Sequence, residues 1–122
     1  MTGEDVDLSH RLIARFATTI VYAQDALLYH RTRSDRSALV RQAFTYGEGA
    51  GHLYRRYPAE LRWDAAKMAT LVGQMARRAA ARLLTRAGHI LGRDDERAVE
   101  FADYHWLWTS RYWAGFFKAY RT

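Results

Sequence analysis

The stretch DAAKMATLVGQMARRAAARLLTRAGHILG (residues 64–92) decides the fold class. Its apolar residues return every three or four positions, which is the period of a helix with one apolar face. Asp64 is a suitable N-cap and Gly92 a suitable C-terminal stop. We therefore predict a helix that starts at Asp64, or at Pro58, and ends at about Leu91. The residues that share its apolar face are Ala65, Met68, Val72, Met75, Ala79, Leu83 and Ile90.

The same periodicity extends outward from this helix, and signals for strands are nearly absent. Three further helices are predicted, from Leu8 to His30, from Ser34 or Asp35 to Tyr57, and from Asp94 or Asp95 to Tyr120. Short connections between helices favour antiparallel neighbours. We predict an all-α fold, a compact four-helix bundle or possible five-helix variant, as a single domain over residues 1–122 with a flexible acidic segment at residues 1–7.

Three glycines interrupt the second predicted helix, at Gly47, Gly49 and Gly51. Each interior glycine costs a helix about 1 kcal/mol relative to alanine, so we expect a kink or a break there. The run lacks the Lys-Ser/Thr pair of a phosphate-binding loop, and no strand precedes it. A close helix–helix contact or a hinge is the better interpretation.

Composition bounds the class of protein. A chain of 122 residues with 49% hydrophobic residues is typical of one globular domain. The absence of cysteine excludes disulfides, a thiol nucleophile and thiolate metal sites, and it fits a reducing cytoplasm. No apolar run reaches the roughly 20 residues that span a bilayer, and residues 1–7 do not resemble a secretory signal. We expect a cytoplasmic protein that does not enter a membrane.

The positive charge is concentrated in the middle of the chain. The net charge is +6, and residues 8–93 hold 15 Lys and Arg against 5 Asp and Glu. Arg78, Arg82 and Arg86 follow one another at every fourth position, and we call them the arginine ridge. Such a ridge favours contact with a phosphate backbone, although a solvated face, or pairing with Glu100 and Asp103, would also explain it. The predicted nucleic-acid-binding residues are Arg78, Arg82, Arg86, Lys67, Arg77, Arg55, Arg56 and Arg93.

The last predicted helix is unusually aromatic. It holds 9 of the 17 aromatic residues, spread over an arc of roughly 220° where a core-facing stripe needs little more than 100°. Three interpretations stay open: an interface with another protein or a second copy, core packing on several sides, and stacking on unpaired bases. The predicted interface residues are Trp106, Trp113, Phe117 and Tyr120.

No pattern indicates a metal or a cofactor. The five histidines are scattered, and no Glu-x-x-His pair or zinc motif occurs. Arg82 and His89 have six residues between them, which is similar to the Arg-x(4–6)-His signature of HEPN ribonucleases. That resemblance implies acid–base work for His89 on a ribose hydroxyl and stabilisation of phosphate charge by Arg82. We expect no catalytic residue and no cofactor, and we keep a HEPN-type ribonuclease as the third hypothesis.

The small size, the helical character, the arginine ridge and the aromatic flank from Trp106 to Phe117 together resemble the small subunits of CRISPR ribonucleoprotein effector complexes, which act in antiviral defence. That resemblance implies a non-catalytic scaffold beside a guide or target strand. We predict a basic helical subunit that binds the backbone of RNA or single-stranded DNA within a larger assembly. The alternative is a protein-interaction or homodimerising bundle.

Overall fold

The computed structural model describes residues 4–19, 21 and 35–122. These residues form four helices and no strand, so the predicted all-α fold is confirmed. The helices are α1 (Glu4–Phe16), α2 (Arg36–Arg56), α3 (Ala65–Ile90) and α4 (Glu96–Arg121).

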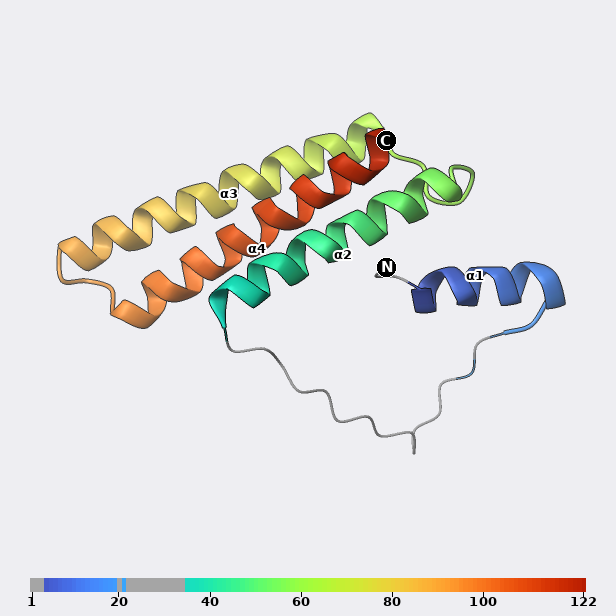
Figure 1. Ribbon diagram of the computed structural model, residues 1–122. Coiled ribbons are helices and arrows are strands. Elements are labelled where there is room, and N and C mark those ends of the chain that lie inside the picture. The colour runs from blue at the N-terminus through green and yellow to red at the C-terminus, as the bar shows by residue number, and fades with distance from the viewer. Residues whose placement is uncertain (1–3, 20, 22–34) are drawn as a thin grey trace.

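Helix α4 lies between α2 and α3 and packs against both of them (Figure 1). Short connections at opposite ends join α2 to α3 and α3 to α4, so each helix runs antiparallel to the next. The shorter α1 lies beside the C-terminal half of α2 (Figure 1). The end of α3 and the beginning of α4 extend past the start of α2, and this protruding end shapes the candidate site.

Aspartates start the three long helices. Each N-cap side chain accepts a hydrogen bond from the backbone N–H three residues on, which satisfies a donor that the helix itself leaves free. Of the alternatives in the sequence, the structure uses Asp35, Asp64 and Asp95, with donor–acceptor distances of 2.8, 2.9 and 2.8 Å. Gly92 follows α3 with φ of +69°, the left-handed conformation expected of a glycine just past a helix.

The predicted first helix, Leu8 to His30, is wrong in its extent. Helix α1 ends at Phe16, Ala17 has φ of +49°, and residues 17–19 are not helical. The β-branched run Thr18-Thr19 that follows is a poor continuation for a helix, because branching restricts χ1. The rest of the predicted stretch, at residues 20 and 22–30, lies outside the described residues. At the other end, Glu4 to Asp7 form the first turn of α1, although the acidic N-terminus was expected to be flexible.

Helix α2 runs without interruption through Gly47, Gly49 and Gly51, so the predicted break is absent. All three glycines are buried. A Cβ atom on Gly47 would overlap the carbonyl oxygen of Tyr112, and one on Gly115 would overlap that of Phe44. The glycines therefore serve close contact between the backbones of α2 and α4, where packing energy offsets their poor helix propensity.

The hydrophobic core lies in the seam between α2 and α4. Phe116 is 1% exposed and is surrounded by aromatic rings from α2, α4 and the α2–α3 connection. Trp63 of that connection has its ring centroid 5.0 Å from that of Phe116 and 5.4 Å from that of Trp113. Tyr54 and Tyr120 complete the cluster. The buried apolar residues among those described are Ala43, Leu71, Phe116 and Ala119.

Candidate functional site

The arginine ridge faces α4 over part of its length. Arg82 donates from Nε to Asp103 Oδ1 at 2.6 Å, and Arg86 donates from Nη2 to Asp103 Oδ2 at 2.6 Å. Burial raises the pKa of the Asp103 carboxyl, but the two guanidinium groups outweigh it and hold that pKa below its ordinary value. Two members of the ridge are therefore committed to an internal ion pair.

Arg78, the third member of the ridge, is half-buried. It lies near His105, whose pKa is lowered first by burial and then by the charge of Arg78. The structure thus pairs Arg82 and Arg86 with Asp103, one of the two acidic neighbours that the sequence suggested. The ridge does not present three free guanidinium groups to solvent.

The other residues predicted to bind nucleic acid are scattered. Arg56 contacts Asp7, and Lys67 contacts the cap Asp64. Three are exposed and have no acidic partner among residues 4–19, 21 and 35–122. They are Arg55 at the end of α2, Arg77 in the middle of α3 and Arg93 beyond its end. The structure does not gather these three into one patch.

The pair that resembles a ribonuclease signature has separate contacts. Arg82 is held by Asp103, while His89 Nδ1 lies 3.0 Å from the carbonyl oxygen of Asp94. Both side chains are positioned by contacts to α4 or to the turn before it. Their geometry does not by itself define a site where they would share a phosphate.

The aromatic residues predicted to form an interface are half-buried. Trp113, Phe117 and Tyr120 belong to the cluster around Phe116, and Trp106 lies farther along the helix. The wide aromatic arc is explained by the central place of α4, which packs on two helices and on Trp63. Packing within the chain, rather than a free flank, accounts for most of these rings.

Helix α3 does not meet α4 with the centre of its apolar face. The side that meets α4 holds Leu71, Met75 and Arg82. Its centre lies roughly 60–70° around the helix from the centre of the predicted apolar face. Met75 and Ala79 of that face are half-buried, whereas Val72, Leu83 and Ile90 are 60%, 69% and 83% exposed. Most of the apolar face that the sequence identified is therefore exposed.

A continuous apolar surface remains exposed on α3, and we call it the α3 apolar face. It covers an arc of about 120° at about 100° per residue. Leu84 and Leu91 are 71% and 69% exposed. All of its members are exposed: Val72, Gly73, Ala76, Ala80, Leu83, Leu84, Ala87, Ile90 and Leu91. Three of its members, Val72, Leu83 and Ile90, belong to the apolar face identified from the sequence.

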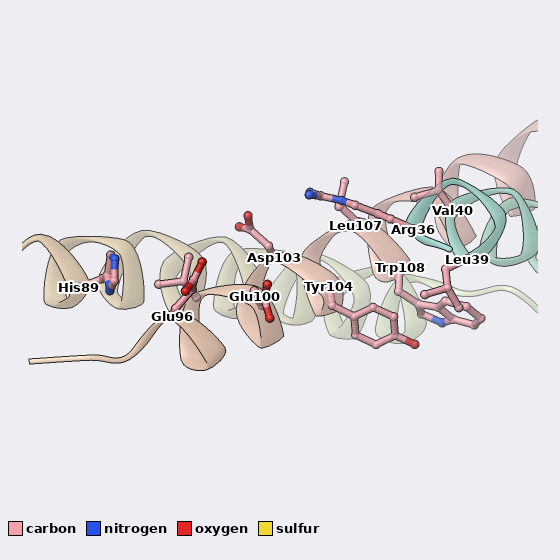
Figure 2. Close-up of a pocket in the computed structure, with 11 residues that line it drawn as sticks. Arg36, Leu39, Val40, His89, Glu96, Glu100, Asp103, Tyr104, Leu107 and Trp108 are labelled. Atoms are coloured by element: carbon pink, nitrogen blue, oxygen red, sulfur yellow. The ribbon is translucent and has the colours of Figure 1, made fainter. Parts of the chain in front are cut away.

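A groove of about 390 Å³ lies at the same end of the molecule, and we call it the acidic groove (Figure 2). Its long wall is α4, where Glu96, Glu100, Tyr104 and Trp108 recur every four residues and so share one side of the helix. The first turn of α2 closes one end. The other lining residues are Arg36, Leu39, Val40, His89, Val99, Asp103 and Leu107.

The lining of the groove is partly apolar and partly acidic. We call Val99, Leu107 and Trp108 its floor, and Glu96 and Glu100, both labelled in Figure 2, its rim. Asp103 is neutralised by its two arginines, but neither glutamate forms an ion pair within the described part of the chain. Sequence reasoning missed this site. The recurrence of Glu96, Glu100, Tyr104 and Trp108 can be seen in the sequence. The sequence does not show that α2 begins too late to cover them.

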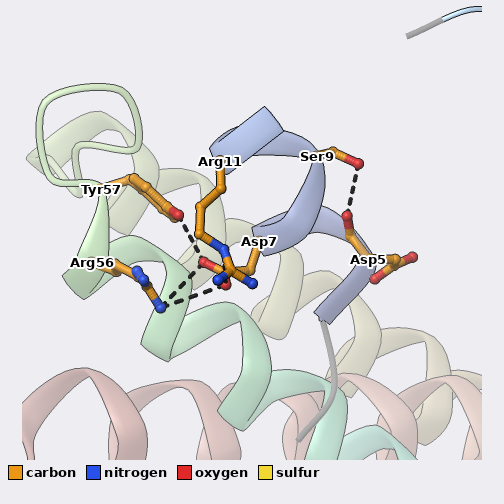
Figure 3. Close-up of polar contacts among 6 residues, drawn as sticks. All are labelled: Asp5, Asp7, Ser9, Arg11, Arg56 and Tyr57. Atoms are coloured by element: carbon orange, nitrogen blue, oxygen red, sulfur yellow. Dashed lines mark hydrogen bonds and ion pairs between the residues drawn. The ribbon is translucent and has the colours of Figure 1, made fainter. Parts of the chain in front are cut away.

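Helix α1 is attached at the opposite end through one carboxylate (Figure 3). Asp7 accepts a hydrogen bond from the Tyr57 hydroxyl at 2.7 Å and pairs with Arg56 and Arg11. His10 stacks on the Tyr57 ring at 5.0 Å. The Tyr57 hydrogen bond is the main cause that lowers the pKa of Asp7. These contacts are structural and lie far from the groove in the fold.

Comparisons with protein-family models, with curated proteins and with solved structures found no match to this chain. Across the described residues, no helix has both the length and the apolar character needed to cross a membrane. The site must therefore be interpreted from its own geometry.

Proposed function

We propose that this protein is a helical protein-interaction module that binds its partner through the α3 apolar face. One observation carries the proposal: α3 has an apolar arc wide enough for core packing, yet it is exposed in the described part of the chain. Helices in globular proteins normally bury an apolar stripe of about 100°. Large exposed apolar patches mark interaction surfaces.

The rest of the fold supports this assignment. The seam between α2 and α4 is closely packed, so exposure on α3 does not reflect loose packing throughout the molecule. Two of the three ridge arginines, Arg82 and Arg86, are paired with Asp103 and not free for a phosphate backbone. What α3 presents to solvent is mainly aliphatic, which suits another protein better than a nucleic acid.

The test is the size of the complex that contains this chain in its own cells. We expect native fractionation to place the wild-type chain in a complex larger than its own 14.2 kDa. The double substitution Leu84→Ser with Leu91→Ser should move it to the size of the free chain. Arg62→Ser, at an exposed position in the α2–α3 connection, is the matched control. A wild-type chain that migrates as a free monomer would overturn the proposal.

Binding of a nucleic-acid backbone is the second candidate function. It is supported by the net charge of +6 and by the exposure of Arg55, Arg77 and Arg93 without acidic partners in the described chain. Binding of single-stranded RNA and duplex DNA across a salt series tests it, because released counterions make affinity fall linearly in log–log form. Binding that is absent at low salt, or unchanged by Arg77→Ala with Arg93→Ala, would remove this function. A subunit of a ribonucleoprotein assembly would use both surfaces.

A further inference from the structure

We propose that the partner is a second copy of this chain, and that the α3 apolar face of each copy fills the acidic groove of the other. The proposal rests on the proposed function and names its partner. Neither surface is covered by residues 4–19, 21 or 35–122, and both lie toward the end of the molecule where α3 and α4 extend past α2 (Figure 1). One contact would therefore cover two surfaces that the described residues leave open.

Charge complementarity favours this pairing. From Ala65 to Ile90, α3 carries five basic residues and no acidic one. Arg77 borders the α3 apolar face, is exposed and has no acidic partner among the described residues. The rim of the groove offers Glu96 and Glu100, which also lack ion pairs there. A basic apolar face and an acidic apolar groove complement each other in both charge and polarity.

The same charges disfavour the simplest alternative, in which α3 packs on α3 of the other copy. That pairing would bring Arg77 of each copy to a helix face that holds no acidic residue, while the other basic residues of α3 are paired or lie toward α4. The groove avoids that meeting of like charges because Glu96 and Glu100 line it. The α3 apolar face is therefore matched to the groove and not to itself.

The dimensions agree as well. The groove follows α4 from Glu96 to Trp108, which is about 18 Å at about 1.5 Å per residue. The bulkiest part of the α3 apolar face, from Leu83 to Leu91, spans about 12 Å on the same scale. Four aliphatic side chains of this part can therefore lie within the groove, against the apolar floor formed by Val99, Leu107 and Trp108.

A two-fold axis makes the contact reciprocal. Each copy contributes one α3 apolar face and one acidic groove, so a symmetric dimer closes both contacts and leaves neither surface open. A head-to-tail arrangement would leave one of each exposed and would continue into a chain of copies. Reciprocity is the feature that a mixing experiment can test directly.

The first measurement is the mass of the purified chain by sedimentation equilibrium. We expect twice the chain mass of 14.2 kDa. Leu84→Ser with Leu91→Ser in the face, and separately Glu100→Lys in the groove, should each raise the dimer dissociation constant tenfold or more, about 1.4 kcal/mol. Glu60→Lys, the same charge change on an exposed site of the α2–α3 connection, should leave it unchanged. A wild-type monomer, or equal effects of Glu60→Lys and Glu100→Lys, would overturn the proposal.

The decisive measurement mixes the two defective chains. A chain with the altered face retains its groove, and the Glu100→Lys chain retains its face, so the mixture can form one of the two contacts. We expect a heterodimer that neither chain forms alone. If both chains remain monomeric after mixing, the face and the groove do not meet, and the proposal is overturned.

A second approach avoids variants that could lose their fold. The chain has no cysteine, so Leu84→Cys in one sample and Val99→Cys in another create single thiols on the face and in the groove. Mild oxidation of the mixture should join these two chains to each other in preference to joining like with like. Preferential Leu84→Cys homodimers would overturn the proposal. The purified chain could be monomeric while its complex in cells still depends on Leu84 and Leu91. That result would overturn the dimer alone and would leave the proposed function in place.

Discussion

The two sides of α4 are built in opposite ways. Toward α2, glycines bring the backbones into contact and Phe116 is 1% exposed. Toward α3, the contact combines buried Leu71 with one carboxylate that holds Arg82 and Arg86, and the apolar arc of α3 remains outside. The α2–α4 seam therefore stabilises the fold within the chain. The α3–α4 seam leaves apolar surface of α3 exposed, and we propose that a partner covers it.

The largest loss of stability is expected from a substitution in the closely packed α2–α4 seam. Phe116→Ala should lower the free energy of unfolding by about 3–5 kcal/mol, because it removes a fully buried ring and leaves a cavity. Phe101→Ala, at a ring that is 66% exposed on the same helix, should cost less than about 0.5 kcal/mol. Chemical denaturation of both variants checks the comparison. Equal losses would show that the two ends of α4 are packed alike.

The next effect concerns the glycine contact. Gly47→Ala should destabilise the fold by about 1–3 kcal/mol, because the new methyl group meets the backbone of Tyr112 and the helices must separate. Gly73→Ala in α3 is the matched control, since no atom lies within 4 Å of its added Cβ. The control should gain about 0.5–1 kcal/mol from better helix propensity. Thermal melting of both variants measures the two effects. If both substitutions raise the melting temperature, α2 and α4 are not in close contact at Gly47.

A loss in the same range is expected where Asp103 joins α4 to α3. Asp103→Asn should cost about 1–3 kcal/mol, because it leaves two guanidinium groups without their half-buried carboxylate. Glu48→Gln breaks a more exposed ion pair with Lys118 in the α2–α4 seam and should cost less than about 1 kcal/mol. Urea titration of the two variants measures both. The interpretation fails if Glu48→Gln is the more costly.

The contribution of the Asp103 carboxylate to stability should depend on pH. The pKa of Asp103 is lower in the folded chain than its ordinary value of 3.8, so the ionised form favours folding. That contribution is present above the ordinary value and is lost as the pH falls through the lowered pKa. Below about pH 4, wild type and Asp103→Asn should therefore converge in stability. Unfolding curves at pH 7 and pH 3 check this, and a constant difference between them would contradict it.

The smallest effect on folding is expected at the open face. Leu84→Ser with Leu91→Ser should change the unfolding free energy of the monomer by less than about 0.5 kcal/mol, because both side chains are largely exposed. Stability is measured at a concentration low enough to keep the chain monomeric. A large loss would mean that the α3 apolar face is covered within one chain, and it would remove the contrast between the two sides.

Much of the fold could be predicted from local signals. Asp35, Asp64 and Asp95 start helices because a short acidic side chain accepts from the free N–H groups of the first turn, wherever the helix lies. The end of α1 was missed because Ala17 carries no stop signal of its own. At the glycines, the expected close contact between helices is present, whereas the expected break is not, because helix propensity alone neglects the packing that α4 supplies.

The candidate site was less predictable. The sequence identified the arginine ridge and suggested that Asp103 might neutralise it, but it could not choose between that pairing and a free basic surface. It also identified the apolar residues of α3 without indicating that most of them would stay outside. The acidic groove exists only because α2 begins at Arg36 while α4 continues beyond it, which is a relation between two helices and not a property of either.

By itself the sequence determined the helical class, the caps, the position of the charges and the residues available for packing, because these follow from interactions within a few residues along the chain. The tertiary structure decided which side of α3 meets α4, which arginines are neutralised and which apolar surface stays open. The physical reason is that a helix with apolar and polar faces can be rotated by roughly a quarter turn at little local cost. Only the packing of neighbouring helices fixes that rotation.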